Sequence, residues 1–323
     1  MVGPLGRVLH TKEMDMRSTR SIPVAAALLA ALASGCGEDG LGGILISDSK
    51  EIEIGQGVDQ QIEAEMKIAA DDDPTSVWAR EMLAPMVLAS AQFRNPAEIG
   101  GYKIEVIVDD DLVNAFAAPG GFLYITTGLI AGADGCGEIA GVLGHELGHV
   151  TERHGVKQIE GQFAASAIAD FFLGDGITKE AAKLIWAVLQ STQFSQRHES
   201  ESDSVGLQIA HDAGYHPDSL ASFFQKLLDV QAAAGGGRNA ITDFLSSHPA
   251  TEDRIEAVRA EAARRYPNLA DETLATVDCV GTTQTLADVV AHIEAGGVQV
   301  RPGTGEGLPD EEGEDDDPPP EDN

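Results

Sequence analysis

The sequence predicts an α+β fold, in which a small β-sheet is followed by a bundle of helices. Residues 102–110, YKIEVIVDD, alternate apolar and polar side chains, which is typical of a half-buried strand. Residues 121–127, GFLYITT, follow a Pro-Gly-Gly turn and predict a second strand. From residue 137 onward, apolar side chains recur with helical spacing, so helices are expected to make up most of the domain.

The elements follow in order along the chain. Before the sheet, residues 50–67 and 71–93 have helical spacing, and the second segment opens with an acidic N-cap cluster and Pro74. Six further helices are expected after the sheet, over residues 137–153, 156–172, 179–193, 198–213, 217–234 and 251–265. We expect one domain over residues 50–265 and a C-terminal extension over residues 266–303.

The charge of the chain excludes one class of partner. Among its 323 residues, Lys and Arg number 21 and Asp and Glu number 53, which gives a formal net charge of −32. Nucleic-acid binding needs clustered cations, so no nucleic-acid partner is expected. Part of the acidity lies in residues 304–323, which end in LPDEEGEDDDPPPEDN and are expected to form a disordered tail.

The N-terminus has the parts of a secretory signal. Arg17 and Arg20 precede an apolar run over residues 22–32, which is too short to span a bilayer as a stable helix. Small residues then lead to Cys36, in an arrangement similar to a bacterial lipobox. We expect residues 1–35 to be a signal peptide with an upstream extension, Cys36 to be lipidated, and residues 36–49 to be a linker. The alternatives are an ordinary signal peptide with an incidental cysteine and a non-cleaved anchor.

Two cysteines remain after Cys36. Cys136 and Cys279 match no zinc-ribbon spacing, and three cysteines are too few for a disulfide scaffold. Export would place both thiols in an oxidising compartment, where a disulfide is stable. The sequence does not decide whether the two are close enough to pair.

The segment GVLGHELGHVTERHG, residues 141–155, contains candidate metal ligands and a candidate catalytic carboxylate. His145 and His149 are four residues apart, so on a helix they point the same way and their nitrogens can converge on one zinc ion. Glu146 is adjacent but not collinear, so it can reach a water at the metal without being a ligand. Two surface histidines on a helix are the alternative. The apolar stripe of the helix lies about 140° from the histidines, which favours a metal-binding face.

A third ligand is expected from a second helix. Glu199 and Asp203 are four residues apart, so they share one face of the helix predicted for residues 198–213. Glu199 as ligand and Asp203 as acceptor of a histidine N–H would hold a ligating imidazole in place. Glu201 is the rival ligand, and spacing alone does not exclude it.

Two further histidines require interpretation. His154 comes five residues after His149, which on a continuous helix turns it about 140° away from the metal face. We therefore expect it to cap the end of the helix, where a cation meets the dipole. His248 precedes a proline and a capping-type helix start, so it is expected in a loop, where site residues are common.

Four segments together resemble the family-48 zinc metalloendopeptidases, which include CAAX prenyl proteases, HtpX and periplasmic BepA-like proteases. The segments are VNAFAAPGGFLYITTGLI, EIAGVLGHELGHVTERHG, FSQRHESESD and SSHPATEDRI, and they occur in family order within residues 50–265. The resemblance implies a mostly helical zincin-like (gluzincin) domain with a small β-sheet next to the HExxH helix. Ser202 stands where the family usually has alanine. The absence of membrane-spanning segments after the signal favours the soluble periplasmic branch.

The resemblance also assigns roles to residues. It implies one Zn²⁺ per subunit, held by His145, His149 and Glu199, with Asp203 behind the ligands. It implies that Glu146 is the general base and that His248 lies near the open coordination position. Substrate would lie along a rim and edge strand formed by Asn114 and residues 120–126, Gly120 and Gly121 included. His248 or Arg254 is expected to supply a donor to the oxyanion.

These expectations define a function. We expect a zinc metalloendopeptidase that cleaves polypeptides, most simply unfolded or misassembled envelope proteins in quality control. A lipid at Cys36 would hold it on the membrane, facing the periplasm, and Gly37 after this cysteine favours the outer membrane over the inner. The alternatives are a zinc-containing, chaperone-like binding protein of the envelope with little or no proteolysis, and a narrow processing peptidase with one client.

Overall fold

The structure, a computed structural model, describes residues 43, 45–163, 176–233, 242–269 and 279–307. By contacts the chain divides into one unit over Met1–Cys36 and a second over Gly37–Asn323, and only the second is described below. The expected signal peptide, the lipidated Cys36 and most of the expected acidic tail lie outside the described residues. Within the described residues, no helix combines the length and the apolar character needed to cross a membrane.

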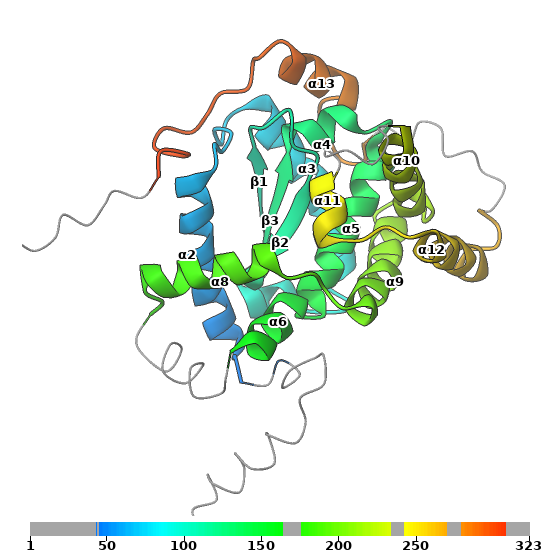
Figure 1. The fold of residues 1–323 in the computed structure, drawn as a ribbon. Helices are drawn as coiled ribbons and strands as arrows, with labels where there is room; N and C mark the ends of the chain where they lie inside the picture. Colours follow the sequence, from blue (N-terminus) through cyan, green and yellow to red (C-terminus); the bar gives the residue numbers. More distant parts are fainter. Residues whose placement is uncertain (1–42, 44, 164–175, 234–241, 270–278, 308–323) are drawn as a thin grey trace, which may run out of the picture. The chain divides into compact units, whose positions relative to one another are not determined.

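The domain has the predicted α+β class, with a three-stranded sheet among many helices (Figure 1). The strands are β1 (Lys103–Ile107), β2 (Ala115–Ala118) and β3 (Phe122–Thr126). The helices are α2 (Asp48–Glu65), α3 (Pro74–Ser90), α4 (Thr127–Gly132), α5 (Cys136–Thr151), α6 (His154–Gln162), α8 (Lys179–Ser191), α9 (Gln196–Asp212), α10 (Ser219–Ala233), α11 (Thr242–Ser247), α12 (Glu252–Arg265) and α13 (Leu286–Glu294). Short 3₁₀ turns occur over Pro96–Ile99 and Pro119–Gly121.

Several helices begin where side chains cap them. Ser195 accepts a hydrogen bond from the His198 amide at the start of α9, and Thr251 accepts one from the Arg254 amide at the start of α12. Asp73 caps α3 in the same way, ahead of Pro74. These caps fix the ends of the helices that carry site residues.

The sheet corrects one expectation. Strand β3 was expected to be the edge strand along which substrate lies, but it is the middle strand, parallel to β1 and antiparallel to β2. The free edge belongs instead to β2, which the sequence did not predict. Its residues, AFAA, have no β-branched side chain and end at a proline, so they give no strand signal of their own.

Helix α5 is buried on all sides over most of its length, in a core it shares with α3, α9 and α10. It packs most closely on α9. A Cβ added to Gly206 would lie 2.6 Å from the backbone of Gly144 and His145, and one added to Gly148 would lie 2.8 Å from the Ser202 carbonyl oxygen. The two backbones therefore touch along a seam that only small residues allow, which brings the side chains of α5 and α9 to one point.

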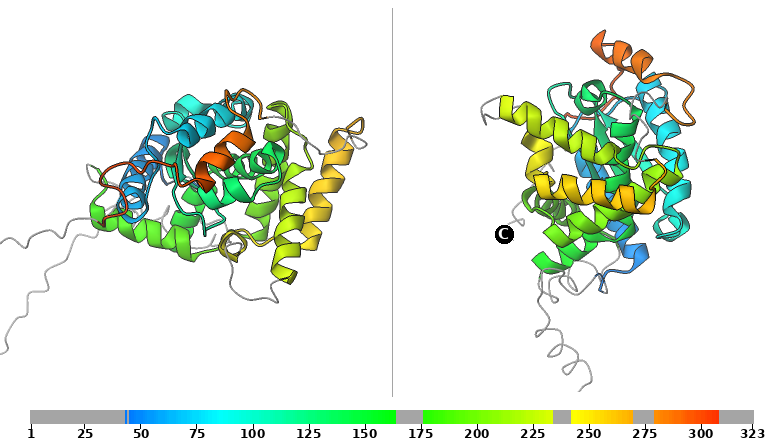
Figure 2. Two further views of the ribbon diagram at one scale, coloured as in Figure 1. Left: turned by 90° about the horizontal axis from the view of Figure 1, so that it is seen from above. Right: turned by 90° about the vertical axis from the view of Figure 1, so that its right-hand side faces the viewer.

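Residues 279–307 pack as part of the domain. A disulfide joins Cys136, at the start of α5, to Cys279, with their Cα atoms 5.1 Å apart. Helix α13 packs beside α3, on a different side of the domain from α12 (Figure 2). Beyond it, Val300 forms a bridge to Ala69, and the Arg301 amide donates to the Ile68 carbonyl. At the other end, α2 begins at Asp48, inside the expected linker.

Candidate metal centre and active site

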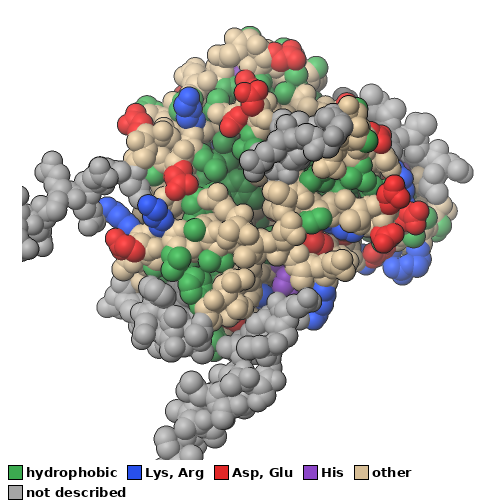
Figure 3. Space-filling model, viewed as in Figure 1, with side chains coloured by type: hydrophobic (Ala, Val, Ile, Leu, Met, Phe, Trp, Pro, Cys, Tyr) green, Lys and Arg blue, Asp and Glu red, His purple; other side chains and the backbone are tan. Residues whose placement is uncertain are grey.

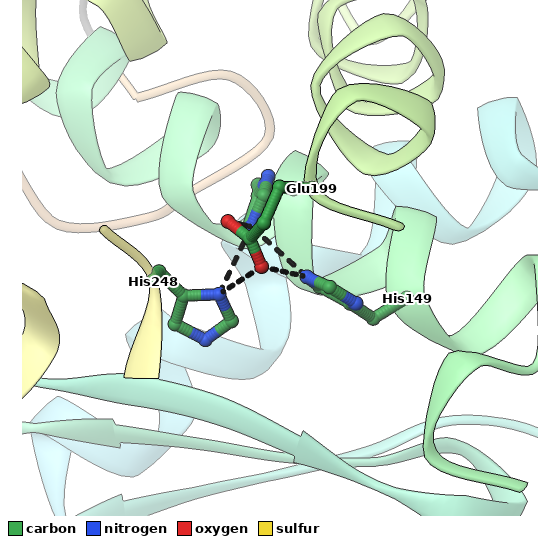
Figure 4. Close-up of side chains that lie close together, drawn as sticks. His149, Glu199 and His248 are labelled. Atoms are coloured by element: carbon green, nitrogen blue, oxygen red, sulfur yellow. Dashed lines mark hydrogen bonds and ion pairs between the residues drawn. The ribbon is translucent and has the colours of Figure 1, made fainter. Parts of the chain in front are cut away.

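Four side chains from two helices and a loop meet in the interior. His145 and His149 come from α5, Glu199 from the first turn of α9, and His248 from the residue after α11. One ligand atom from each lies within 4.8 Å of the others, and all four side chains are buried. Figure 4 shows His149, Glu199 and His248 pointing toward one another. Glu201, the rival ligand, points elsewhere: it pairs with His154 and Arg197.

The spacing of these atoms fits zinc. Nε2 of His145 lies 3.0 Å from Nε2 of His149, and the Glu199 oxygens lie 3.5 and 3.4 Å from these two atoms. Zinc bonds to nitrogen and oxygen are about 2.0–2.1 Å, so ligand atoms of a tetrahedral site are about 3.3 Å apart. Two imidazoles and a carboxylate are also a common ligand set of catalytic zinc.

Acidic partners lie behind the ligands. Nδ1 of His145 is 2.9 Å from Oδ1 of Asp203, which leaves its Nε2 free to face the metal position. Arg254 donates to both oxygens of Asp203, at 2.9 and 2.7 Å, and its third nitrogen is 2.6 Å from Glu199. Burial disfavours the charge of Glu199, but His248 and His145 outweigh burial and hold the pKa of this carboxyl well below its ordinary value.

Arg254 is therefore not in the expected position beside substrate. Its guanidinium lies on the Phe224 ring and is occupied by Asp203, Glu199 and the Pro249 carbonyl. A cation paired in this way holds Glu199 and Asp203 in place and is not available to an oxyanion. The sequence shows that an arginine follows the His-Pro motif but not which way it points.

Glu146 lies beside the ligand cluster, next to His248. It is buried, and it borders a cavity of about 430 Å³. Burial raises the pKa of its carboxyl, although His248, His145 and the Ala117 backbone oppose this shift. A carboxylate that is buried beside a metal position and faces a cavity is placed to accept a proton from a water held there.

His248 occupies the remaining side of the cluster. Its Nδ1 is 3.2 Å from Nε2 of His145 and 3.1 Å from Glu199, so it can act as a fourth ligand. Its Nε2 is 3.4 Å from Glu146. The sequence predicted a position near the open coordination position, and in the structure the ring lies close enough to the three expected ligands that it would be able to join them around a metal ion.

The cavity runs from Glu146 and His248 along the edge of the sheet. Besides these two residues, its lining comes from β2 and the segment before it, from α8 and the following loop, and from α11; it includes Asn114, Phe116, Trp186, Leu189 and Phe194. Hydrophobic side chains gather on this face, over the sheet and α8 (Figure 3). Asn114 lines the cavity, whereas Gly120 and Gly121 do not. They pack against α2 and residues 99–101, and the Gly120 amide donates to Glu51.

A second group of acidic side chains, Asp59, Glu63 and Glu105, is also close enough to hold a cation. It already contains cations of the chain. Lys103 lies 2.8 Å from both Asp59 and Glu105, and Arg301 lies 2.7 Å from Glu63. These pairs tie the C-terminal segment to α2 and β1.

His154 does not point away from the metal face as expected. Helix α5 ends at Thr151, and Arg153 adopts a left-handed conformation (φ 57°, ψ 34°) before α6 begins at His154. This break invalidates the 140° rotation, which holds only on a continuous helix. His154 instead lies fully buried with its Nδ1 3.0 Å from Nδ1 of His149. Glu152 and Arg153, which form the turn, are neither glycine nor proline, and Gly155 comes only after α6 has begun, so the sequence gives little warning of the break.

Comparison with known protein sequences identifies the same family that the four motifs resemble. The sequence model of peptidase family M48 matches residues 75–262. The chain is 28% identical over 260 residues to the mitochondrial metalloendopeptidase OMA1 of Arabidopsis thaliana, covering 77% of this chain and 52% of the relative. It is 28% identical to the beta-barrel assembly-enhancing protease of Escherichia coli K12, covering 50% and 34%, and 28% identical to the metalloprotease LoiP of that strain, covering 49% and 61%. The chain thus spans between about a third and three fifths of the length of these relatives.

Proposed function

The chain belongs to peptidase family M48, and from that premise we propose that it is a zinc-dependent metalloendopeptidase acting on polypeptides. One observation carries the proposal. His145, His149 and Glu199 converge on one point, and Glu146 stands beside that point at the end of the cavity. Metal, base and substrate space are thus adjacent, as peptide hydrolysis requires.

Each residue has a defined task in this reaction. His145, His149 and Glu199 would hold one zinc ion per subunit, and Asp203 and Arg254 keep His145 and Glu199 in place. When bound, zinc supplies Lewis-acid activation of a water molecule and of the peptide carbonyl. Glu146 accepts the proton of the attacking water and returns it to the leaving amine. Phe116, Trp186, Leu189 and Phe194 give the cavity apolar walls beside this exchange.

The substrate would bind in an extended form along β2. The Thr126 amide donates to the Asn114 carbonyl, so Asn114 and Phe116 direct their backbone groups toward β3. Ala115 and Ala117 therefore direct their backbone N–H and C=O groups toward the free edge of the sheet, where Glu146 lies near Ala117. Backbone pairing at this edge would hold a peptide next to the metal while reading few of its side chains, which suits unfolded clients.

A second candidate function rests on His248. A ring that stays in the fourth coordination position would exclude the attacking water, and the protein would then be a zinc-containing, chaperone-like binding protein of the envelope. Zinc-loaded wild-type protein that cleaves casein would exclude this candidate. Absence of cleavage, together with X-ray absorption that shows four protein ligands, would favour it over the peptidase.

The decisive experiment compares wild-type protein with Glu146→Gln. The variant keeps the shape of the side chain and all ligands, so its zinc content should equal that of wild type. Casein cleavage should fall by about 10²- to 10⁴-fold, because a general base contributes that much. Retained cleavage in a contaminant-free preparation would refute the role of Glu146. Cleavage of several unfolded proteins, against cleavage of none, would distinguish a quality-control protease from a processing enzyme with one client.

We extend the proposal to location. The signal-like N-terminus supports export to a bacterial cell envelope, with a lipid on Cys36 and a periplasm-facing domain, and Gly37 favours the outer membrane. Misassembled envelope proteins would be the clients. A Cys36→Ala variant should then appear in the soluble periplasmic fraction, and a variant that stays with the membrane would contradict the lipid anchor.

A further inference from the structure

We propose that His154 and Glu201 form a positioning relay that orients His149 for zinc, with the left-handed turn at Arg153 as the feature that places it. The inference rests on the proposed zinc function and deepens it. In this arrangement the two ligand histidines of α5 are held by different means: His145 by the carboxylate of Asp203, and His149 by a second imidazole. His154 and Glu201 are positioning residues and not ligands.

The contacts form a continuous chain from the ligand to the surface. Nδ1 of His149 lies 3.0 Å from Nδ1 of His154, and Nε2 of His154 lies 3.2 Å from Oε2 of Glu201. Arg197 donates to the other oxygen of Glu201 at 2.9 Å. His154 has no exposed surface, whereas the Glu201 side chain is 33% exposed. The relay thus begins at the metal centre and ends in a carboxylate at the protein surface.

The chemistry of these atoms fixes where the protons are. An ionised carboxylate only accepts hydrogen bonds, so His154 carries its proton on Nε2 and donates it to Glu201. Its Nδ1 is then an acceptor. A ligand histidine that offers Nε2 to a metal carries its proton on Nδ1, and this N–H needs an acceptor. Nδ1 of His154 is that acceptor, and the Ser202 hydroxyl lies 3.1 Å from the same atom.

The backbone at Arg153 is what makes this geometry reachable. Arg153 is the one residue other than glycine with a positive φ in the part of the chain that the structure describes. A left-handed conformation is unfavourable for arginine, so it persists only where other contacts hold it. Its side chain donates to Glu51 at 2.9 Å and to the Gly43 carbonyl at 2.8 Å. Contacts from the start of the domain therefore maintain the turn that brings His154 behind His149.

The packing around His154 excludes a solvent-facing role. The His198 ring stacks on it with centroids 4.3 Å apart, and Phe194 stacks on His149 at 4.0 Å. A histidine that capped the helix end would instead need its nitrogens at the last carbonyls of α5. Both nitrogens of His154 are committed to side chains: His149 and Ser202 on one side, and Glu201 on the other.

The test compares zinc affinity and the tautomer of His149, that is, which ring nitrogen carries the proton, in three variants. His154→Phe keeps a buried ring but removes both nitrogens, and zinc affinity, measured by competition with a chromophoric chelator, should fall by about 10- to 100-fold. His154→Asn places an amide oxygen near the position of Nδ1 and should restore most of the affinity. Glu201→Gln, at the exposed end, should give a smaller loss. In the metal-free protein, ¹⁵N NMR should show His149 protonated on Nδ1 in wild type and Asn variant, but not in the Phe variant.

Two controls separate the possible outcomes. His211→Phe removes a histidine from the far end of α9 and should leave zinc affinity unchanged. Circular dichroism of each variant identifies misfolding, and if the Phe variant misfolds, the Asn and Gln variants still decide. A His154→Phe protein that binds zinc within about twofold of wild type, with the same His149 tautomer, overturns the relay. Wild-type protein that binds no zinc would instead overturn the proposed function.

Discussion

The metal centre has a back and a front that are built differently. At the back, which comprises the seam of α5 and α9 with Asp203, Arg254 and His154, each ligand histidine meets a buried partner. At the front, which comprises Glu146, His248 and the cavity along β2, the side chains border open space of about 430 Å³. The difference suggests that the two sides have different roles. Residues at the back hold the metal ligands in position, and residues at the front contact the substrate and transfer the proton. Variants of the two sides should therefore fail in different ways.

The largest effect is expected at the back, from Asp203→Ala. The change leaves Arg254 buried without its bidentate partner and His145 Nδ1 without an acceptor. Breaking a buried ion pair in this way costs about 3–5 kcal/mol of stability, measured by urea denaturation. Zinc affinity should fall by about 10- to 100-fold in the same protein. Asp212→Ala, on the same helix but partly exposed, should cost less than about 1 kcal/mol; equal losses would remove the distinction.

The glycine seam should give the next largest effect. In Gly206→Ala the new methyl group would meet the backbone of Gly144 and His145 at 2.6 Å, so α5 and α9 must move apart. Overpacking of this kind costs about 1–3 kcal/mol, and zinc affinity should fall with it because Glu199 moves away from the histidines. Gly132→Ala is the matched control, since nothing lies within 4 Å of its added Cβ. Thermal unfolding and chelator competition measure both quantities, and a Gly206→Ala protein that matches this control would show that the seam is not tight.

At the front, Leu189→Ala should change substrate preference without changing zinc affinity. Leu189 lines the cavity from α8 and is partly exposed. The variant loses part of the apolar lining of the cavity. Its kcat/KM for peptides whose side chain at the cavity is large and apolar should fall by about 10-fold or more, relative to peptides with alanine at the same position. Zinc affinity should equal that of wild type. Loss of zinc in this variant would break the division between front and back.

The smallest effect is expected far from both sides, at Asp73. Burial alone would raise the pKa of its carboxyl, but the backbone N–H groups of Gln299 and Thr75 outweigh burial and lower the pKa. A lowered folded-state pKa contributes stability above the unfolded value, near pH 4, and this contribution is lost as the pH falls through the folded value. Asp73→Ala should therefore cost about 1 kcal/mol at pH 7.

The stability difference between wild type and Asp73→Ala should depend on pH. At pH 3 the gap between wild type and Asp73→Ala, measured by denaturant titration, should be smaller than at pH 7. Asp72→Asn, at the exposed neighbouring position, should show no such trend. Zinc content and cleavage should be unchanged in both variants. A gap that is constant with pH would mean that the cap does not depend on the charge of Asp73.

Much of the fold and the ligand set could be predicted from the sequence. The predicted helices match the observed ones closely where caps or prolines mark their starts, as in α3 and α12. The strand at β2 was missed because four small or aromatic residues give no periodic signal, and α13 was missed within a segment expected to be an extension. The assignment of β3 to the edge was wrong because strand order is a property of the sheet, which pairs residues distant in sequence.

Within the site, helical periodicity alone was enough to predict which side chains share a face of one helix. His145 and His149 share a face because they are four residues apart, and Glu199 and Asp203 do so for the same reason. Only the tertiary structure decided the rest. The position of His248 depends on docking across 103 residues of chain, and that of His154 depends on a left-handed turn held by the start of the domain. Local spacing sets which side chains can act together on one helix, but contacts between distant segments decide which of them meet.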